Sequence, residues 1–562
     1  MPAFSLFYDS WLPVRRRSGA KSLIRPAEIA SHMDDPIVAF AWGRPDFDAA
    51  SREFMIGLLA TAFPAPENHR QWRALYDAPP TPARLDGAFA PFVEALRLDG
   101  DGPRFMQDFD VLEGTDETPV SGLLIDAPGA NTLKENKDLF QKRGQAAFLS
   151  RPAAAMALFA LQTFAPSGGA GHRTSLRGGG PLTTLVAPSD DDSLWRQLWL
   201  NTPKEDEAFA PAAAELPRVF PWLAPTFVSD GKPARLVAAS ATPAPWTAHL
   251  LQAFWGTPRR IRLVFAANDA RAPCPLTGRI DDVIVTAYRT RPWGAAYDPS
   301  FQHPLSPYYF SKGKPPSWLP VHPQPGGVPY SDWPSLTAAV DDESRPAKLT
   351  AAAQARLAAR AGVTDARLRA CGYDMDNMKA RGFVEAQMPL FILPEDADAS
   401  TRASVAGLAR RLVDAADIAA SIAGIAVRIA LAGERAKGDT TPFSALRERF
   451  FQDTHDAFFA QLRDAFGVAD TLGDGAARQP FAKVWLDTLR KCAADLFDEA
   501  VNFDAMPQKI MDRAVSARRN LTGAFLGHGA LGKKLFTALE IAQPEPAGKG
   551  AGKRGKKMEK SE

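Results

Sequence analysis

A glycine-rich segment between Pro166 and Pro181 has the composition best suited to binding chemistry. It reads P-S-G-G-A-G-H-R-T-S-L-R-G-G-G-P, with six glycines, two arginines and one histidine but no carboxylate. Glycine adopts positive φ at little cost and lets backbone amides approach a ligand closely. Arg173 and Arg177 would add positive charge beside those amides. One interpretation is therefore an anionic or groove-shaped partner, and the other is an ordinary surface loop.

The sequence lacks the spacing of familiar catalytic and metal sites. No lysine follows the glycines as G-x-x-x-x-G-K-[ST] requires, and a helical pattern rather than a strand precedes them. The motifs H-E-x-x-H and G-x-S-x-G and metal-spaced Cys/His clusters are also missing from the sequence. We therefore expect no catalytic residue, no metal site and no cofactor. An enzyme with an unrecognised phosphate-binding glycine loop stays open as an alternative.

The segment Asp374-Met-Asp376-Asn377 superficially resembles the start of a calcium-binding loop. Lys379 stands where such a loop requires glycine, which breaks the ligand geometry. We expect a structural turn or a helix cap that opens a helical C-terminal half.

Pro128 to Lys137 is a second segment suited to nucleic acid, because it is small, polar and contains the amides of Asn131 and Asn136. Such side chains bond phosphates, sugars and base edges at low steric cost. The other interpretation is a solvated loop that caps a helix starting near Glu135.

Basic side chains gather at two more places. The sequence S-P-Y-Y-F-S-K-G-K predicts a hairpin tip with Lys312 and Lys314, a geometry that suits groove contact but is also common at protein surfaces. Arg410 and Arg411 lie among other arginines on one long helical pattern. That helix could follow a single strand of nucleic acid or simply be solvated.

Length and charge restrict the class of protein. A chain of 562 residues is too long to fold around a single hydrophobic core, so two or three domains are expected. The net charge of +2 gives no global attraction to DNA or to an anionic membrane. Three distant cysteines exclude a disulfide framework and suit a reducing compartment. The most apolar run, Ala415 to Gly433, carries charged residues and is expected to be a buried helix. With no secretory leader pattern, we expect a cytoplasmic protein without membrane contact.

Periodicity predicts the elements that position these segments. Two short strands are expected around an S-G-A-K turn near the N-terminus, and further strands at Pro258–Ala266 and Asp282–Tyr288. Helical patterns cover Ala49–Thr61 and Ala153–Thr163. Abundant prolines rule out long regular elements between Pro304 and Pro334.

From Glu385 to Leu539 nearly all of the sequence is alanine-rich and amphipathic, which predicts helices. Four long helices with short loops are expected at Ser404–Ala432, Phe443–Phe466, Phe481–Val501 and Pro507–Ala524. The predicted class is α+β, with a large mixed α/β N-terminal domain at residues 1–378 and an all-α C-terminal four-helix bundle at residues 379–541. The basic stretch 542–562 lacks packing residues and is expected to be disordered.

Several long segments together resemble one protein family. They are F-S-L-F-Y-D-S-W-L-P-V-R-R-R-S-G, L-L-I-D-A-P-G-A-N-T-L-K-E-N-K-D-L-F, A-A-M-A-L-F-A-L-Q-T-F-A-P-S-G-G-A-G-H-R-T-S-L-R-G-G-G-P-L-T-T-L, F-W-G-T-P-R-R-I-R-L and G-Y-D-M-D-N-M-K-A-R. With these segments the chain resembles the large subunit of the type I-E CRISPR surveillance complex Cascade, the CasA family. The likeness runs from Phe4 into the helical half.

The resemblance implies a non-catalytic subunit with a mixed α/β domain and a C-terminal four-helix bundle. It would recognise the protospacer-adjacent motif in duplex DNA, promote duplex opening and R-loop formation, and recruit a helicase-nuclease, while guide pairing reads the remaining sequence. Implied partners are the duplex target, the displaced strand, the guide-RNA 5′ end, neighbouring Cascade subunits and the helicase-nuclease. A helical scaffold without nucleic-acid contact is the remaining alternative.

The resemblance also implies which residues sense the motif. They comprise a loop that meets the minor groove through its backbone, a neighbouring arginine, and lysines of a hairpin that reach the same groove. In this sequence they are Gly168, Gly169, Ala170, Gly171, Arg173, Lys312 and Lys314.

Further positions are implied for the RNA end and the separated strands. Ala130, Asn131 and Thr132 lie in what resembles the loop that anchors the subunit to the guide-RNA 5′ end. Val363 and Thr364 fall where the family's strand-separating wedge is expected. Arg410 and Arg411 lie on the bundle, which would cradle the displaced strand or neighbouring subunits.

Two departures from the family pattern are visible. Some members carry a C-x-x-C pair where this chain has Ser150-Arg151-Pro152-Ala153, so no zinc site is expected. The wedge of the family often bears glutamine, and the turn around Val363 has none.

Overall fold

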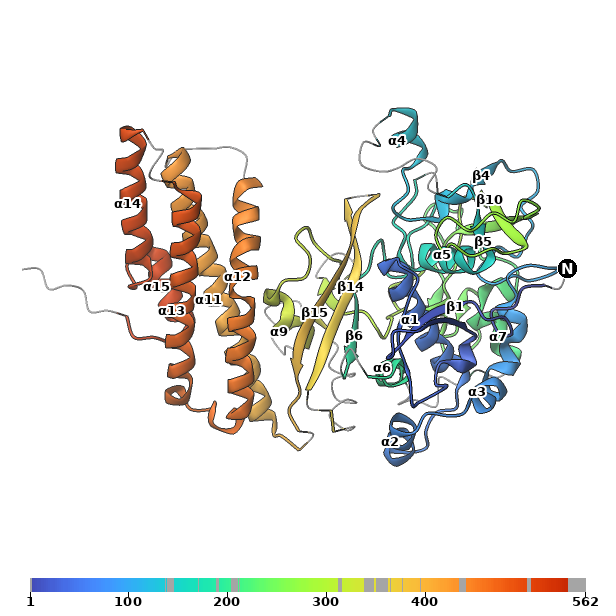
Figure 1. Cartoon of the computed structure of the whole chain (residues 1–562), viewed down its shortest axis with the longest axis horizontal. Coiled ribbons are helices and arrows are strands. Elements are labelled where there is room, and N and C mark those ends of the chain that lie inside the picture. The colour runs from blue at the N-terminus through green and yellow to red at the C-terminus, as the bar shows by residue number, and fades with distance from the viewer. Residues whose placement is uncertain are drawn as a thin grey trace, which may run out of the picture. The chain divides into compact units, whose positions relative to one another are not determined.

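The computed structural model describes two compact units. The described residues are 3–136, 138, 146–169, 171–188, 192–203, 211, 213–311, 316–337, 348–349, 362–363, 365–376, 378–394, 396–433, 441–502 and 507–543. Unit 1 comprises Met1–Val328 and Ser335–Asp396, and unit 2 comprises Pro329–Pro334 and Ala397–Glu562. Unit 1 mixes helices and sheets whereas unit 2 is helical, which confirms the α+β class (Figure 1).

The N-terminal sheet of unit 1 has the strand order β2-β1-β3. Its strands are β1 (Leu12–Arg16), β2 (Lys21–Ile24) and β3 (Ile37–Phe40). The first two pair antiparallel from Leu12↔Ile24 to Arg15↔Lys21. Gly19 in the turn between them has φ +90°, a conformation that glycine adopts without strain. The hairpin predicted around S-G-A-K is confirmed.

Two buried helices form the centre of unit 1. They are α1 (Pro45–Ala62) and α5 (Arg151–Phe164), which pack against each other. Phe54 of α1 and Phe159 of α5 meet edge to face, with ring centroids 5.7 Å apart. The Ser150 hydroxyl accepts a hydrogen bond from the Ala153 amide and caps α5. Both helices contain the ranges predicted from periodicity.

The second sheet has the order β4-β10-β5, with β9 also paired to β10. Its strands are β4 (Glu117–Pro119), β5 (Leu149–Ser150), β9 (Arg260–Ala267) and β10 (Val283–Arg291). The long β9 and β10 pair antiparallel and confirm the two strands predicted in this region.

The third sheet corrects the sequence analysis. Its order is β15-β14-β6, with β6 (Thr183–Ala187), β14 (Asp365–Asp376) and β15 (Lys379–Phe391). Helix was expected from Glu385 onward, but Glu385 pairs with Cys371 in this hairpin. The alternation of burial toward the end of β15, where Met388 and Leu390 are buried, has the two-residue period of a strand.

Of the structural turn or helix cap expected near Asp374, the turn is confirmed and the helix cap is wrong, because β14 and β15 form a hairpin here. The Asp374 carboxylate receives two hydrogen bonds from the Arg381 guanidinium, at 2.9 and 2.7 Å. The division expected after residue 378 falls between the two strands of this hairpin, and unit 1 continues to Asp396.

Short elements complete unit 1. A sheet of order β12-β11-β13 joins β11 (Tyr308–Ser311), β12 (Ser317–Pro320) and β13 (Lys348–Leu349), and β7 (Ala238–Ala239) pairs parallel with β8 (Thr247–Ala248). The short helices are α2 (His69–Asp77), α3 (Pro82–Phe89), α4 (Ala130–Lys134), α6 (Leu194–Leu200), α7 (Leu216–Val219) and α8 (Gln252–Trp255). A further short helix, α9 (Trp333–Thr337), begins in the Pro329–Pro334 segment of unit 2 and ends in unit 1.

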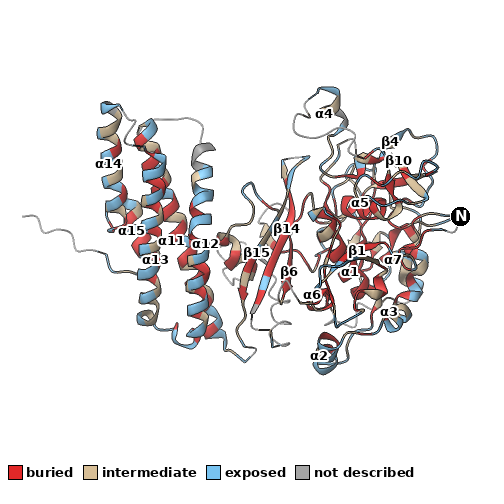
Figure 2. Ribbon diagram, in the orientation of Figure 1, coloured by how far each residue is buried: buried red, intermediate tan, exposed pale blue. Residues whose placement is uncertain are grey.

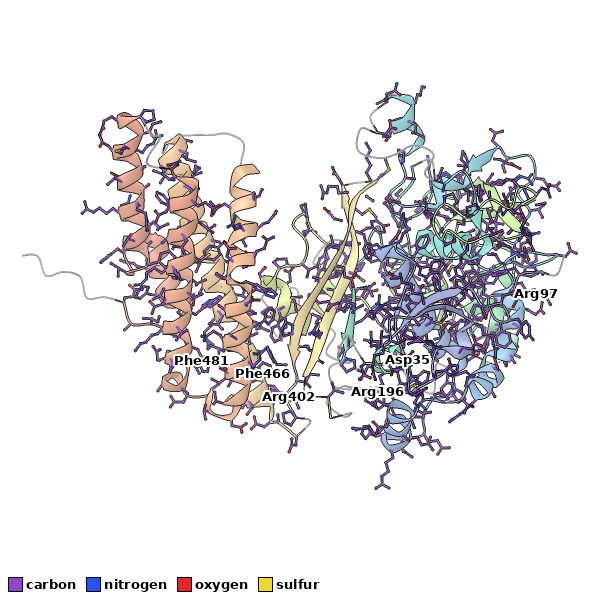
Figure 3. The ribbon with its side chains drawn as sticks, viewed as in Figure 1. Asp35, Arg97, Arg196, Arg402, Phe466 and Phe481 are labelled. Carbon is purple, nitrogen blue, oxygen red and sulfur yellow. The ribbon has the colours of Figure 1, made fainter. Side chains whose placement is uncertain are left out.

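Unit 2 is built from α11 (Ala399–Ala432), α12 (Thr441–Gly467), α13 (Gly475–Ala500), α14 (Gln508–Ala524) and α15 (Gly529–Ala538). The first four contain most of each predicted helix, and α15 is an additional short helix. Arg402 near the start of α11, Phe466 at the end of α12 and Phe481 near the start of α13 lie at one end of the unit (Figure 3). Consecutive long helices therefore run antiparallel, as in an up-and-down bundle.

The apolar helix α11 is the centre of this bundle. It is long and apolar enough to cross a membrane by length and composition alone. Its alanines and leucines, however, pack against α12, α13, α14 and α15, and a buried stripe runs along it (Figure 2). A buried core helix passes the same test of hydropathy, so α11 agrees with the buried helix predicted from the sequence.

Candidate nucleic-acid interface

The tip of the glycine-rich loop is closed by its own backbone. The Gly168 amide donates to the His172 carbonyl at 3.2 Å, and the His172 amide donates to the Gly169 carbonyl at 2.8 Å. Gly169 has φ +70°, and a Cβ placed on it would meet no atom within 4 Å. Gly168 is exposed. The tip thus presents backbone without side chains to the outside, as the sequence analysis expected, while Ala170 lies outside the described residues.

The base of the loop is fastened to the segment after β10. The Trp293 amide donates to the Gly171 carbonyl at 2.8 Å, and a Cβ on Gly171 would lie 2.8 Å from the Trp293 ring. Arg173 donates from Nε to the Ser229 hydroxyl at 2.8 Å and lies over Trp293, 5.0 Å from the ring centroid. Its guanidinium therefore holds the loop in place.

The second glycine run packs inside unit 1. Gly180 has φ +62°, and a Cβ there would lie 2.3 Å from the Tyr373 carbonyl oxygen. A Cβ on Gly179 would lie 2.7 Å from the Cα of Pro166. These glycines allow close packing of backbone, so the open backbone of the loop lies in the first glycine run, at Gly169.

Arg177 is not the surface cation that the sequence analysis expected beside the loop amides. Its side chain and that of Glu53 are each only 2% exposed, and they form an ion pair with 2.5 Å between Nη2 and Oε2. Arg177 also donates to the hydroxyls of Thr183 at 3.1 Å and Ser306 at 2.9 Å. The cost of burying a charge is offset by these partners. Glu53 lies on α1, more than a hundred residues away in sequence, which is why composition alone misplaced Arg177.

This buried pair fastens the lysine hairpin to the glycine loop. Ser306 precedes β11, and its hydroxyl is bound by Arg177. After β12, the His322 ring lies 3.2 Å from the Arg177 carbonyl oxygen, and the Leu182 amide donates to the Val321 carbonyl at 2.9 Å. Both ends of the hairpin thus contact the segment that leaves the glycine loop.

The predicted hairpin itself is confirmed in its strands. β11 and β12 pair antiparallel from Tyr308↔Pro320 to Ser311↔Ser317, and Phe310 packs edge to face on Trp318. Lys312 and Lys314 lie outside the described residues.

The wedge candidate leads into the same framework. Val363 is partly exposed and precedes β14, whose residues Arg367–Cys371 pair with β6, the strand that directly follows the glycine loop. Thr364 lies outside the described residues. The glycine loop, the hairpin and the entry to β14 are therefore held by one continuous framework, formed by residues 177–187 and β14. This framework is named the β6–β14 support below.

The segment expected to anchor the RNA end forms a short helix instead of a loop. Ala130, Asn131 and Thr132 belong to α4, whose first turn closes with the Leu133 amide bonded to the Gly129 carbonyl at 3.0 Å. Helix α4 projects from the body of unit 1 (Figure 1). It ends at Lys134, and most of the residues of the helix expected from about Glu135 lie outside the described part of the chain.

The two bundle arginines differ in their partners. Arg411 forms an ion pair with Glu540 at 3.1 Å, and Glu540 is shared with Arg478 at 3.0 Å. Arg410 is partly exposed and forms no ion pair within the described part of unit 2. Arg411 therefore contributes to bundle packing, and Arg410 is the freer cation.

Two half-buried histidines near the loop are neutral at neutral pH. Burial lowers the pKa of His172, and the nearby Arg259 lowers it further. Burial likewise lowers the pKa of His322. No group of three or more His, Cys, Asp or Glu side chains that could hold a metal occurs among the residues the structure describes.

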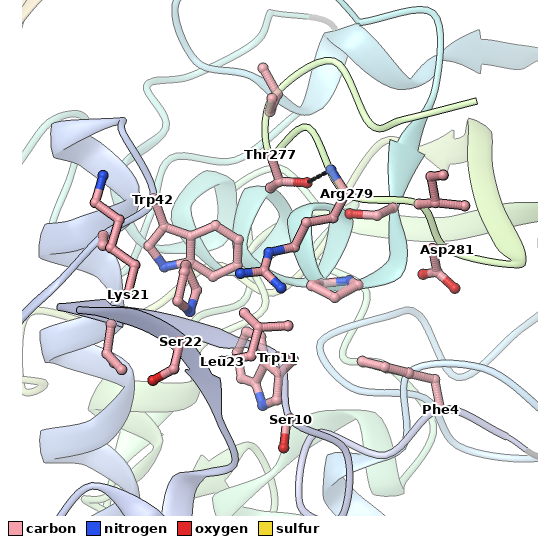
Figure 4. Close-up of a pocket in the computed structure, with 17 residues that line it drawn as sticks. Phe4, Ser10, Trp11, Lys21, Ser22, Leu23, Trp42, Thr277, Arg279 and Asp281 are labelled. Atoms are coloured by element: carbon pink, nitrogen blue, oxygen red, sulfur yellow. Dashed lines mark hydrogen bonds between the residues drawn. The ribbon is translucent and has the colours of Figure 1, made fainter. Parts of the chain in front are cut away.

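A cavity of about 420 Å³ lies elsewhere in unit 1, between the N-terminal sheet and the segment 276–281. Trp11, Trp42, Lys21 and Arg279 line it, and the Arg279 side chain reaches toward Trp42 (Figure 4). No residue of the glycine loop lines this cavity, so it is separate from the candidate interface.

A mixed domain with this loop and hairpin, followed by an antiparallel helical bundle, has the fold of a class of CRISPR-associated proteins. A solved Cse1 from Thermobifida fusca matches with a TM-score of 0.67 at 16% identity, over 96% of this chain and 99% of that one. Cse1 from Acidimicrobium ferrooxidans matches with a TM-score of 0.63 at 17% identity, over 93% and 98%. A chain of a CRISPR RNA-guided surveillance complex matches with a TM-score of 0.60 at 16% identity, over 93% and 100%.

The family itself is shown by sequence. The family model described as CRISPR-associated protein Cse1 matches residues 5–496, which is most of the chain. The chain therefore belongs to the Cse1 family, and the resemblance to the CasA large subunit is confirmed.

Proposed function

We propose that this chain is the non-catalytic large subunit of a type I-E CRISPR RNA-guided surveillance complex in the cytoplasm. In that role it recognises the protospacer-adjacent motif of duplex DNA from the minor groove and promotes opening of the duplex. It then recruits the helicase-nuclease that degrades the target. Its further partners are the guide-RNA 5′ end, the displaced strand and neighbouring subunits. Membership of the Cse1 family supports this role.

The proposed reader consists of Gly168–Gly171 and Lys312, with Lys314 beside it. Backbone at the loop tip meets the groove, and the lysine supplies a donor and a positive charge. Arg173 acts as a positioning residue, because its guanidinium is bonded to Ser229. The remaining assignments are contacts with the RNA end for Ala130, Asn131 and Thr132, the wedge for Val363 and Thr364, and the displaced strand for Arg410 and Arg411.

One observation carries the proposal: an open, side-chain-free loop tip and a hairpin share the β6–β14 support. Gly168 is exposed and a Cβ on Gly169 would meet open space, whereas Gly171 and Gly180 are packed. The hairpin is fastened to the loop exit through Arg177 and His322. A reader of a narrow groove needs close backbone approach and a cation at a fixed distance from it. The open tip supplies the close backbone approach. The shared β6–β14 support fixes the base of the hairpin that carries Lys312.

The experiment is a gel shift of the reconstituted complex on duplexes that differ only in the flanking motif. Gly169→Asp places a carboxylate at the open tip, and Lys312→Ala removes a cation. We expect both variants to lose discrimination between motifs while guide-RNA binding persists. Gly19→Asp and Lys483→Ala are matched controls, since Gly19 is an open glycine at φ +90° in a distant turn and Lys483 is exposed on the bundle. Equal affinity of the parent complex for all motifs would refute the reader role.

A further inference from the structure

Arg259, within the segment F-W-G-T-P-R-R-I-R-L, lies directly behind the glycine loop. Its backbone is clamped by Gln162 of α5: the Arg259 amide donates to Gln162 Oε1 at 3.0 Å, and Gln162 Nε2 donates to the Arg259 carbonyl at 2.9 Å. Its Nη2 donates to the Pro166 carbonyl oxygen at the start of the loop. The backbone and the guanidinium of Arg259 are thus both held by hydrogen bonds, which fixes the guanidinium relative to the loop.

Within the part of the chain that the structure describes, the guanidinium has no anionic partner. No carboxylate among the described residues forms an ion pair with Arg259, and its buried Nε has no hydrogen-bond partner there. The next residue, Arg260, is different, because it pairs with Asp108 at 2.6 Å. Burial lowers the pKa of Arg259, so the protein stabilises this cation less than water would. A buried cation without an anionic partner destabilises the folded protein unless an anion from outside the chain binds to it.

The exposed Gly168 is the loop residue that lies beside this cation. A Cβ on Gly168 would lie 3.5 Å from Arg259 Nη1 and 2.9 Å from the His172 Cβ. Any larger residue at Gly168 would therefore crowd His172 and cover the guanidinium. Because Gly168 is exposed and has no side chain, an anionic oxygen can approach Nη1 there. The neighbouring His172 is neutral, since burial and Arg259 lower its pKa.

We propose that Arg259 Nη1, the open face of Gly168 and the His172 side chain form a binding site for one backbone phosphate of the duplex. This inference rests on the proposed function, because the loop tip must lie at the groove for a phosphate to reach Arg259. Phosphate fits because it is the anion that borders both edges of the groove at every sequence. Binding of this phosphate sets how deeply the loop tip enters the DNA groove, whichever motif is present.

The test is the salt dependence of DNA binding by the reconstituted complex. Arg259→Gln is expected to weaken binding about tenfold on every flanking sequence and to reduce the slope of log affinity against log salt by about one. Preference among motifs should remain, and Arg259→Lys should restore the slope. The control Arg271→Gln removes the same charge from an exposed pair with Asp282 and should change neither quantity.

Neutral methylphosphonate substitutions in the DNA keep the proposal falsifiable if a variant folds poorly. Replacing each phosphate near the motif in turn should reveal one position that weakens binding of the parent, with no further loss in Arg259→Gln. If no position shows this coupling, or if the salt slope of a folded Arg259→Gln equals that of the parent, the site does not bind DNA phosphate. Competition by inorganic phosphate at constant ionic strength, with no methylphosphonate effect, would also overturn it. If the parent complex binds all flanking motifs equally, the proposed function is refuted. The salt slope of Arg259→Gln can still be measured in that case.

Discussion

At the scale of single residues, the glycines of the loop divide by what surrounds them. Gly169 and Gly180 both have positive φ, but a Cβ on Gly169 meets open space and one on Gly180 meets the Tyr373 carbonyl oxygen at 2.3 Å. The first position needs glycine only for its backbone angle, whereas the second also needs it for packing. Composition could not separate the two, because the partner of Gly180 comes from β14.

Alanine substitutions should measure that difference. Gly169→Ala is expected to cost about 1–2 kcal/mol in the free energy of unfolding, the usual cost of a left-handed alanine. Gly180→Ala should cost clearly more, because backbone must also move away from the new methyl group. Urea unfolding of both variants provides the measurement. Equal losses would show that Gly180 is not confined as described.

Buried neutral histidines make a pH-dependent contribution to stability. Burial holds the pKa of His303 well below its ordinary value, and Arg177 lowers it further. The unfolded chain therefore binds more protons than the folded chain as pH falls below about 6.5. The contribution of the neutral histidine to stability is fully present above that pH and is lost progressively below it. The slope per histidine is at most about 1.4 kcal/mol per pH unit. We expect urea midpoints to fall between pH 7.5 and 5.5, and His303→Asn to flatten the fall; a slope unchanged by the substitution would contradict this assignment.

At the scale of elements, the β6–β14 support joins parts that are distant in sequence. Arg177 leaves the glycine loop, Glu53 comes from α1, and Ser306 leads into β11. The three meet in one buried cluster. Consequently the position of the hairpin relative to the loop depends on an ion pair that is itself buried.

Breaking that pair should therefore affect both folding and motif reading. Arg177→Met leaves the Glu53 carboxylate buried without its cation, which costs about 3–5 kcal/mol. The double variant Arg177→Met with Glu53→Leu should recover part of the stability, since no charge is left buried. We expect the double variant to fold yet to discriminate motifs less well, because the contact with Ser306 is lost. Thermal unfolding and gel shifts of both variants test this, and full motif discrimination by the double variant would show that the cluster does not set the reader geometry.

At the scale of the whole molecule, the chain leaves unit 1 at Pro329–Pro334, contributes to unit 2 and then returns. Tyr330 of this segment is 1% exposed, and its ring centroid lies 4.3 Å from that of Phe458. Its hydroxyl forms a hydrogen bond with the Thr454 hydroxyl at 2.9 Å. The bundle core is thus completed by a residue from well before its first long helix. The prolines around Tyr330 gave no sign of this in the sequence.

Tyr330 substitutions should test the role of that segment. Tyr330→Ala removes a buried ring and should cost about 3–5 kcal/mol, whereas Tyr330→Phe loses only the hydrogen bond and should cost about 1 kcal/mol. Hydrogen exchange should report lost protection in α12 and α13 for the alanine variant, with β6 and β14 unaffected. Protection lost first in β14 would contradict the assignment of this segment to unit 2.

The helices and the early hairpin could be predicted because local periodicity decides them. The strand at Glu385–Phe391 could not, since its alanine-containing sequence pairs with β14 through contacts that no local pattern encodes. The same holds for the site. The glycines of the tip stand out in the sequence, but the burial of Arg177 depends on its ion pair with Glu53. The position of Arg259 depends on its hydrogen bonds with Gln162 and Pro166. Arg259 and Gln162 were missed, although the R-R pair after Pro258 was visible.

In the proposed function, the tip at Gly168 and Gly169 lies against the DNA at the motif. The most direct measurement is photo-cross-linking of the reconstituted complex to duplexes carrying a reactive group in the minor groove of the motif, followed by peptide mapping. We expect cross-links to the peptide that contains residues 166–173, abolished by Gly169→Asp and retained in Gly19→Asp. Cross-links confined to other peptides, or equally strong on duplexes without the motif, would contradict it.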